Sequence, residues 1–191
     1  MITPFVKCHY LGDKESIANR LYLSGMLALS EGDMALACSQ VEQALALYQE
    51  MKLQHRTALS LYALAQVAET CGDSARSRAL YEQGVVLARE SGDKGKIPAG
   101  LEGLAAAVAA QGNNAWAAHL WGAAEALRET IGAPLPPVDR VSYDRAVASS
   151  RTQLGEQAFA AAWAEGRTMS LKQALATPGP GKENSHEKDM G

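Results

Sequence analysis

The sequence repeats at an offset of 40 residues, and this repeat constrains the fold more strongly than any other feature. Leu21-Tyr22 recurs as Leu61-Tyr62, and Gly32-Asp33 recurs as Gly72-Asp73 and again as Gly112-Asn113. Other positions of the repeat match by size. One position is small in every unit: Ala35, Ala75 and Ala115. Two positions are large and apolar: one holds Val41, Tyr81 and Trp121, and the other holds Leu47, Leu87 and Leu127. Agreement over three units predicts a stack in which each unit packs on the next.

Each unit is predicted to form a helix, a tight turn and a second helix. The glycine of each turn suits the left-handed residue that ends a helix, and the Asp33, Asp73 or Asn113 that follows is a preferred N-cap. Apolar residues recur at spacings of three and four, which is typical of a helix with one buried stripe. We expect first helices over residues 17–31, 56–70 and 96–111, and second helices over 34–51, 74–90 and 114–130.

This pattern resembles the tetratricopeptide repeat. In the middle unit the matching residues are Leu61, Leu64, Ala65, Gly72, Asp73, Ser77, Tyr81 and Gly84. The resemblance implies an all-α fold, a right-handed superhelical stack of antiparallel helix pairs over 15–132, with repeats at about 15–53, 54–93 and 94–132. The period of 40 exceeds the family's usual period of about 34 and would also suit HEAT or armadillo repeats, but the Gly-Asp turns fit those poorly.

The linker sequence Gly92-Asp93-Lys94 recurs two periods earlier as Gly12-Asp13-Lys14. This recurrence predicts a turn near residue 12 and makes residues 1–14 the remnant of a preceding repeat, with Pro4 where a helix interior is expected. The chain is therefore expected to start inside a repeat.

The C-terminal part departs from the repeat. A proline-rich connector begins at Ala133, and helical stretches are expected near 139–153, 156–166 and 171–176, the last with a capping box of Ser170 and Gln173. We expect residues 133–176 to form a helical cap on the open end of the stack. Residues 177–191 carry too few apolar side chains to form a core and are predicted to be disordered.

A second resemblance covers residues from about 97 to 176. It rests on Leu-Trp-Gly-Ala-Ala-Glu-Ala-Leu-Arg over 120–128, Ile-Gly-Ala-Pro-Leu-Pro-Pro over 131–137 and Phe-Ala-Ala-Ala-Trp-Ala-Glu-Gly-Arg over 159–167. These segments are similar to the C-terminal repeat arm of MalT-like and LuxR-type ATPase transcriptional regulators. The resemblance implies the role of such an arm: it binds an inducer or a protein partner, or mediates assembly.

Composition narrows the classes of function. The net charge of −3 and a pI near 5.8 come without a basic helix face, so direct nucleic-acid binding is not expected. No apolar run approaches the roughly 18 residues of a membrane span, and the N-terminus lacks the features of a signal peptide. Three widely spaced cysteines without a C-x-x-C pair predict reduced thiols and a cytoplasmic location.

Motifs that carry chemistry are missing from the sequence. Gly181-Lys182 is followed by Glu183, which does not fit a phosphate-binding loop, and no G-x-S-x-G nucleophile elbow exists. The four histidines share no short spacing that would suit a metal. We therefore expect no enzymatic activity, no metal and no cofactor.

The candidate binding surface follows from the tetratricopeptide resemblance, in which first helices line a concave groove. Carried over by column, the partner-binding residues are Asn19, Tyr22, Met26, Leu59, Tyr62, Gln66, Glu69 and Glu102, with Leu29, Ala99, Ala106 and Ala109 beside them. Two acids and no ring of Lys or Arg disfavour a clamp for acidic C-terminal peptides. Tyr22 and Tyr62 are the most suggestive contacts, and the alternative is that they pack between units.

The leading hypothesis is a protein- or peptide-binding scaffold that acts in signalling or transcriptional regulation. A small-molecule effector sensor is the first alternative. Self-association through the N-terminal end is the second, because an unfinished repeat leaves apolar surface exposed.

Overall fold

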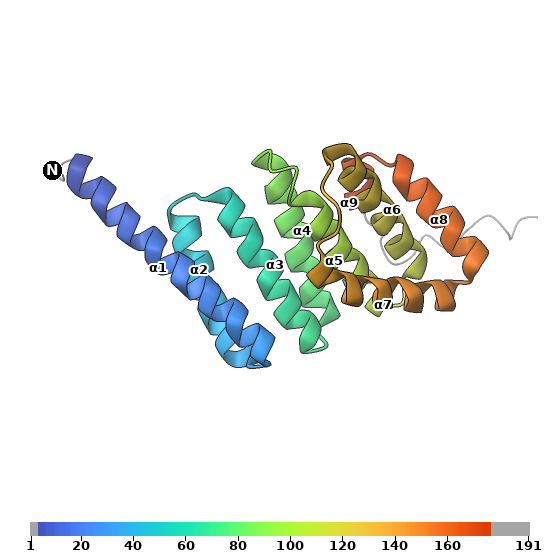
Figure 1. Ribbon diagram of the computed structural model, residues 1–191, viewed down its shortest axis with the longest axis horizontal. Coiled ribbons are helices and arrows are strands. Elements are labelled where there is room, and N and C mark those ends of the chain that lie inside the picture. Colours follow the sequence, from blue (N-terminus) through green and yellow to red (C-terminus); the bar gives the residue numbers. More distant parts are fainter. Residues whose placement is uncertain (1–3, 177–191) are drawn as a thin grey trace, which may run out of the picture.

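The computed structural model describes residues 4–176, with side chains from residue 13 onward, and this part of the chain is helical without strands. In chain order the helices are α1 (Pro4–Glu31), α2 (Met34–Glu50), α3 (Gln54–Thr70), α4 (Ser74–Glu90), α5 (Ile97–Ala110), α6 (Asn114–Ile131), α7 (Pro137–Leu154), α8 (Glu156–Thr168) and α9 (Leu171–Leu175). Helices α1 to α6 follow one another along the long axis of the molecule, α7 returns beside α5 and α6, and α8 lies at the far end (Figure 1). The expected all-α class is confirmed for these residues.

Consecutive helices pack in pairs, α1 with α2, α3 with α4 and α5 with α6 (Figure 1). Within each pair the turn has the predicted chemistry: Gly32, Gly72 and Gly112 adopt left-handed φ values of 85°, 79° and 86°. The next residue then caps the second helix, as Asp33 does by accepting a hydrogen bond from the Leu36 backbone N–H at 2.9 Å. Asp73 and Asn113 cap in the same way. The predicted turns and N-caps are confirmed.

A second left-handed column lies between the pairs, and sequence analysis did not identify it. Lys52, Gly92 and Gly132 follow one another at the repeat offset and have φ values of 58°, 74° and 66°. Each ends the second helix of its pair. Among the described residues, Lys52 is the one residue other than glycine with a positive φ.

The start of α1 differs from the expectation. A first helix was expected from residue 17 after a turn at Gly12-Asp13-Lys14, whereas α1 continues without a break from Pro4 to Glu31. The physical reason is length: a helix ending before residue 12 would have about two turns, which are marginal unless they pack. Continuing α1 keeps the backbone hydrogen bonds at the cost of one helical glycine, about 1 kcal/mol. Pro4 opens the helix, where its missing N–H costs little.

The main apolar core runs from α3 to the C-terminal cap. Tyr81, Leu101, Trp121 and Phe159 are buried in one cluster, while smaller clusters join α1 and α2 to α3. Trp121 is thus a core residue, as its column predicted.

The cap consists of α7, α8 and α9. Helix α8 packs closely on α6 because glycines leave room: a Cβ added at Gly122 would overlap the Trp163 carbonyl oxygen, and one at Gly166 would overlap the His119 carbonyl oxygen. The predicted capping box of Ser170 and Gln173 is present at α9. The tail expected to be disordered, 177–191, lies outside the described residues.

Candidate functional groove

A cavity of about 690 Å³ lies between the first helices of the pairs and α7. Its walls include Leu29 of α1, Gln66 and Glu69 of α3, Ala106 of α5, and Asp139 and Tyr143 of α7. Helix α7 crosses α5 (Figure 1), and side chains of α7 form one wall of this space. We call this cavity the concave groove.

The predicted site residues divide between the groove and the core. Gln66, Glu69 and Glu102 line the groove, together with Ala99 and Ala106. Asn19, Tyr22, Met26, Leu59 and Tyr62 do not line it. The structure therefore brings together the C-terminal half of the predicted surface and places the N-terminal half elsewhere.

Tyr62 is buried between helices and does not line the concave groove, so its assignment as a partner contact stays a prediction that the packing does not favour. Only 6% of it is exposed, and its hydroxyl donates a hydrogen bond to the Lys96 carbonyl at 3.3 Å. Its ring fills space left by Gly84 and Gly100, where an added Cβ would overlap it. Burial raises the pKa of its hydroxyl. The alternative of packing between units holds at this position.

The other N-terminal residues of the predicted surface support the first pair of helices. Asn19 accepts a hydrogen bond from the Tyr48 hydroxyl at 2.8 Å, which ties α1 to α2. Tyr22 and Met26 are half-buried against the cluster around Val41. Because these side chains are already used by the fold, little of them is left for a partner.

Glu102 lines the groove, but its carboxylate is already paired. Arg128 contacts both of its oxygens, at 2.5 Å through Nε and 2.8 Å through a terminal nitrogen, and both side chains are only 12% exposed. Arg128 also donates to the Ala133 carbonyl at 3.1 Å and to the Pro134 carbonyl at 3.4 Å. This bidentate pair holds the proline-rich connector that leads into α7, and hence holds the groove wall.

Glu69 and Asp139 are the carboxylates in the groove that have no ion-pair or hydrogen-bond partner within the described part of the chain. The groove walls displace water around Glu69 and raise the pKa of its carboxyl. Asp139 lies in the first turn of α7, where its charge also favours the helix dipole. Neither Lys nor Arg lines the groove.

The α7 wall was missed by sequence reasoning. Asp139, Ser142, Tyr143 and Ala146 all face the groove, at helical spacings of three, four and seven. That spacing could have identified one face of the helix. It could not have shown which part of the stack this face meets, because α7 lies outside the repeat columns.

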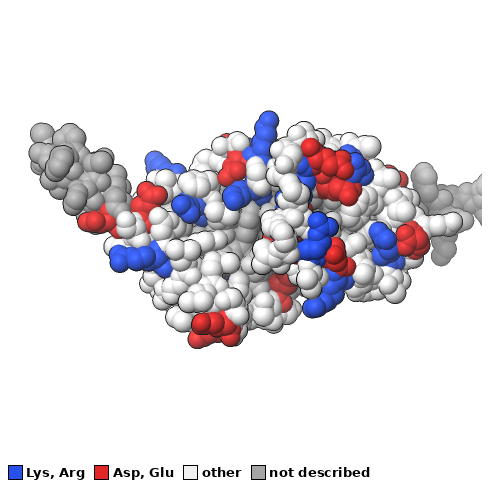
Figure 2. Space-filling model, viewed as in Figure 1, with Lys and Arg blue, Asp and Glu red and all other residues white. Residues whose placement is uncertain are grey.

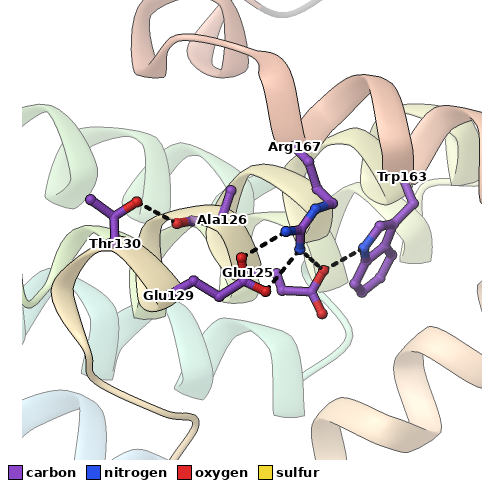
Figure 3. Close-up of polar contacts among 6 residues, drawn as sticks. All are labelled: Glu125, Ala126, Glu129, Thr130, Trp163 and Arg167. Carbon is purple, nitrogen blue, oxygen red and sulfur yellow. Dashed lines mark hydrogen bonds and ion pairs between the residues drawn. The ribbon is translucent and has the colours of Figure 1, made fainter.

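Helices α6 and α8 are tied together by a polar cluster on the other side of the connector. Arg167 contacts Glu125 at 2.5 Å and Glu129 at 2.6 Å, and the Trp163 indole N–H donates to Glu125 at 2.8 Å (Figure 3). Arg167 lowers the pKa of the Glu129 carboxyl. These four side chains are bonded to one another, so this cluster ties α8 to α6.

An apolar strip is exposed on the outer face of α1. Leu23 is 65% and Leu27 59% exposed, whereas their counterparts one period later, Ala63 and Val67, are 3% and 5% exposed because the preceding pair covers them. No residue in the described part of the chain covers the α1 strip.

Among the side chains that the structure describes, no three His, Cys, Asp or Glu come together in a way that could hold a metal. None of the described helices combines the length and apolar character that crossing a bilayer requires. On the face shown in Figure 2, positive and negative side chains are interspersed.

In comparisons with family models, with curated proteins and with solved structures, nothing matched the chain. The two family resemblances read from the sequence therefore stay predictions.

Proposed function

We propose that the chain is a tetratricopeptide-like scaffold, a right-handed superhelical stack of antiparallel helix pairs, which binds a protein or peptide segment in the concave groove. Sequential pairing of the helices and the repeated Gly-Asp turns support the fold proposal. The single observation that carries the binding proposal is the groove itself. It is about 690 Å³ in size, walled by three helix pairs and α7, and contains carboxylates that the fold does not use.

The proposal extends to the class of regulator whose arm the sequence resembles. The matched segments hold the cap in place: Trp121 is core, Gly122 and Gly166 let α6 and α8 approach, and Arg128 fixes the connector. The resembling motif is thus a packing signature, which supports a shared cap architecture. The motif does not indicate a ligand, so the chemistry of the ligand has to be inferred from the residues that line the groove.

The test is selection from a random 12-residue peptide library displayed on phage, followed by affinity measurement on the enriched peptides. Ala106→Phe fills the groove from α5, and Ser142→Phe fills it from α7. We expect enriched peptides to bind the wild type and to lose binding to both variants, provided that each variant melts as the wild type does. Failure to enrich any peptide, or equal binding to both blocked variants, would show that the groove is not the binding site.

A small-molecule effector is the second candidate, and the size of the groove favours it. Pockets for small ligands are about 300–1,000 Å³, and the groove falls inside this range. A ligand at a hundred times its dissociation constant would stabilise the fold by about 2.7 kcal/mol. A thermal-shift screen of sugars and metabolites, repeated on Ala106→Phe, measures this. Hits that persist in the blocked variant would argue against a groove ligand.

Self-association is the third candidate and rests on the exposed leucines of α1. If a second copy covers this strip, the wild type is a dimer at high concentration and the Leu23→Gln, Leu27→Gln double variant is a monomer. Light scattering as a function of concentration decides this, and a monomeric wild type removes the proposal.

A further inference from the structure

The groove has a charge that the fold leaves uncompensated. Of the residues that the structure describes, three acidic ones line it, Glu69, Glu102 and Asp139, and none of the basic ones does. Arg128 neutralises Glu102 in the bidentate pair. The hydrogen bond with Glu102 raises the pKa of the Arg128 guanidinium, and Asp139 adds to this rise, but the donors of Arg128 are taken up by Glu102 and the connector carbonyls. Within the described part of the chain, no Lys or Arg forms an ion pair with Glu69 or Asp139.

These two carboxylates belong to different walls of one space. Glu69 projects from α3, and Asp139 from the first turn of α7. Tyr81 of α4 lines the same cavity, and the pKa of its hydroxyl is raised by burial first and then by the charges of Glu69 and Asp139. A group that enters the groove therefore meets negative charge from two sides.

The remaining walls suit the alkyl or planar part of a cation. Tyr143 is half-buried beside the groove, with its ring edge-on to Trp121 at a centroid distance of 6.4 Å. Aromatic faces attract guanidinium and ammonium groups. Ala99 and Ala106 leave room for a long, thin side chain along α5.

We propose that the groove recognises a basic side chain, Arg or Lys, of the bound segment and holds it between Glu69 and Asp139. This inference rests on the proposed peptide-binding function and adds the chemistry of the partner. A cation placed there makes charge-assisted hydrogen bonds to two carboxylates and offsets the desolvation of Glu69. An acidic segment would meet only like charge at the same place.

The test uses the amino-acid composition of the peptides that the wild type enriches from the random library. Glu69→Gln with Asp139→Asn removes both charges at nearly constant volume. The matched control, Glu90→Gln with Asp144→Asn, removes the same charge from exposed positions outside the groove. Peptides are selected from the same library on each of the three proteins. The peptides that bind the wild-type protein most tightly are then titrated into all three proteins.

We expect the wild-type and control pools to be enriched in Arg or Lys and the double-variant pool to lose this enrichment. Peptides enriched on the wild-type protein should bind the double variant at least roughly tenfold more weakly than the wild type, since hydrogen bonds to charged groups contribute about 1.5–3 kcal/mol. Their affinity for the wild type should also fall as salt rises.

Two failures are distinguishable. If peptides enrich and depend on an open groove but lack basic residues, or bind the double variant as tightly as the wild type, the charge inference is wrong and the scaffold proposal stands. If no peptide enriches, or if binding ignores Ala106→Phe and Ser142→Phe, the scaffold proposal itself fails, and the inference fails with it.

Discussion

Lys52 has a left-handed backbone, with a φ of 58°, at a position where the next two repeats have Gly92 and Gly132. A side chain in this region brings Cβ close to the following carbonyl oxygen, which costs about 1–2 kcal/mol. The residue ends α2 and starts the turn to α3, so its conformation is fixed by the packing of the two pairs. The strain is therefore carried by the folded state.

Lys52→Gly should stabilise the protein by up to about 1 kcal/mol, because the strain removed exceeds the entropy that glycine adds to the unfolded chain. For a chain of this length the melting temperature would rise by about 2–4 °C. Lys52→Ala is the control, since alanine keeps the Cβ. Differential scanning calorimetry of both variants is the measurement, and an equal effect of the two would contradict the backbone explanation.

Glu69 gives a prediction about pH. Its pKa is raised above the usual value of 4.5 because the groove walls displace part of the water around the charged form. Folding thus favours the protonated Glu69 carboxyl. Its contribution to the free energy of unfolding is complete below about pH 4.5 and is lost as the pH rises through the raised pKa of the folded state. Since the side chain stays exposed, the effect is small.

Glu69→Gln should therefore equal the wild type in stability at pH 4 and exceed it slightly at pH 7. Urea unfolding at both pH values measures this. A variant that is less stable than the wild type at pH 7 would mean that the Glu69 carboxylate has a stabilising partner within the fold.

Residue identity predicted the turns better than it predicted the contact surface. Gly32 and Asp33 act through local backbone chemistry, which the sequence specifies directly. Tyr62 acts through the space left by Gly84 and Gly100, on two other helices. Such a cavity between units cannot be read from one column, so Tyr62 was assigned to the groove.

At the scale of helices, the cap depends on the close approach of α6 and α8. Gly166 faces the backbone of His119, so a methyl group there has no flexible neighbour to displace. Gly166→Ala should cost about 1–3 kcal/mol through overpacking, although alanine is the better helix former. Chemical denaturation measures this loss.

Gly95→Ala is the control for that substitution. A Cβ at Gly95 would lie 3.5 Å from an Asp93 carboxylate oxygen, an ordinary contact, so its effect should stay within about 0.5 kcal/mol. If Gly166→Ala is equally mild, α8 is free to move away from α6, and the cap does not fix the position of α7.

Helix boundaries were predictable wherever a glycine turn and an N-cap flank the element. The boundaries of α4 agree with the expected 74–90, and α5 and α6 differ from expectation by one residue at one or both ends. The start of α1 was wrong because Gly12-Asp13-Lys14 is compatible with either a turn or a helix. Only packing between units distinguishes these two states.

At the scale of the whole molecule, stability should be uneven along the stack. The largest core cluster extends from α3 to α9, whereas α1 and α2 rely on small clusters and expose one face of α1. In a stacked array each pair is stabilised mainly by its neighbours, so the pair with an uncovered face opens first.

Hydrogen–deuterium exchange should show the lowest opening free energies in α1 and α2 and the highest in α5 and α6. Leu23→Gln, Leu27→Gln serves as the control, because it changes the exposed strip without removing a buried contact. Uniform protection from α1 to α6, with one cooperative transition, would contradict a stack of separable pairs.

The groove is a property of this whole arrangement. Sequence columns identified its α3 and α5 walls through Gln66, Glu69 and Glu102, since these belong to the repeat. They could not identify the α7 wall, because Arg128 and the proline connector determine where α7 returns to the stack. Part of the candidate site was therefore predictable, and its closure was not.

The most direct test of groove binding is an NMR titration of isotope-labelled protein with the tightest peptide from the library. We predict that backbone amide shifts change at Gln66, Glu69, Ala106, Asp139 and Ser142, while those of α2, the exposed strip of α1 and the outer face of α8 stay in place. Saturable changes confined to α2, the outer face of α8 or the α1 strip, with the groove residues unmoved, would contradict the proposal.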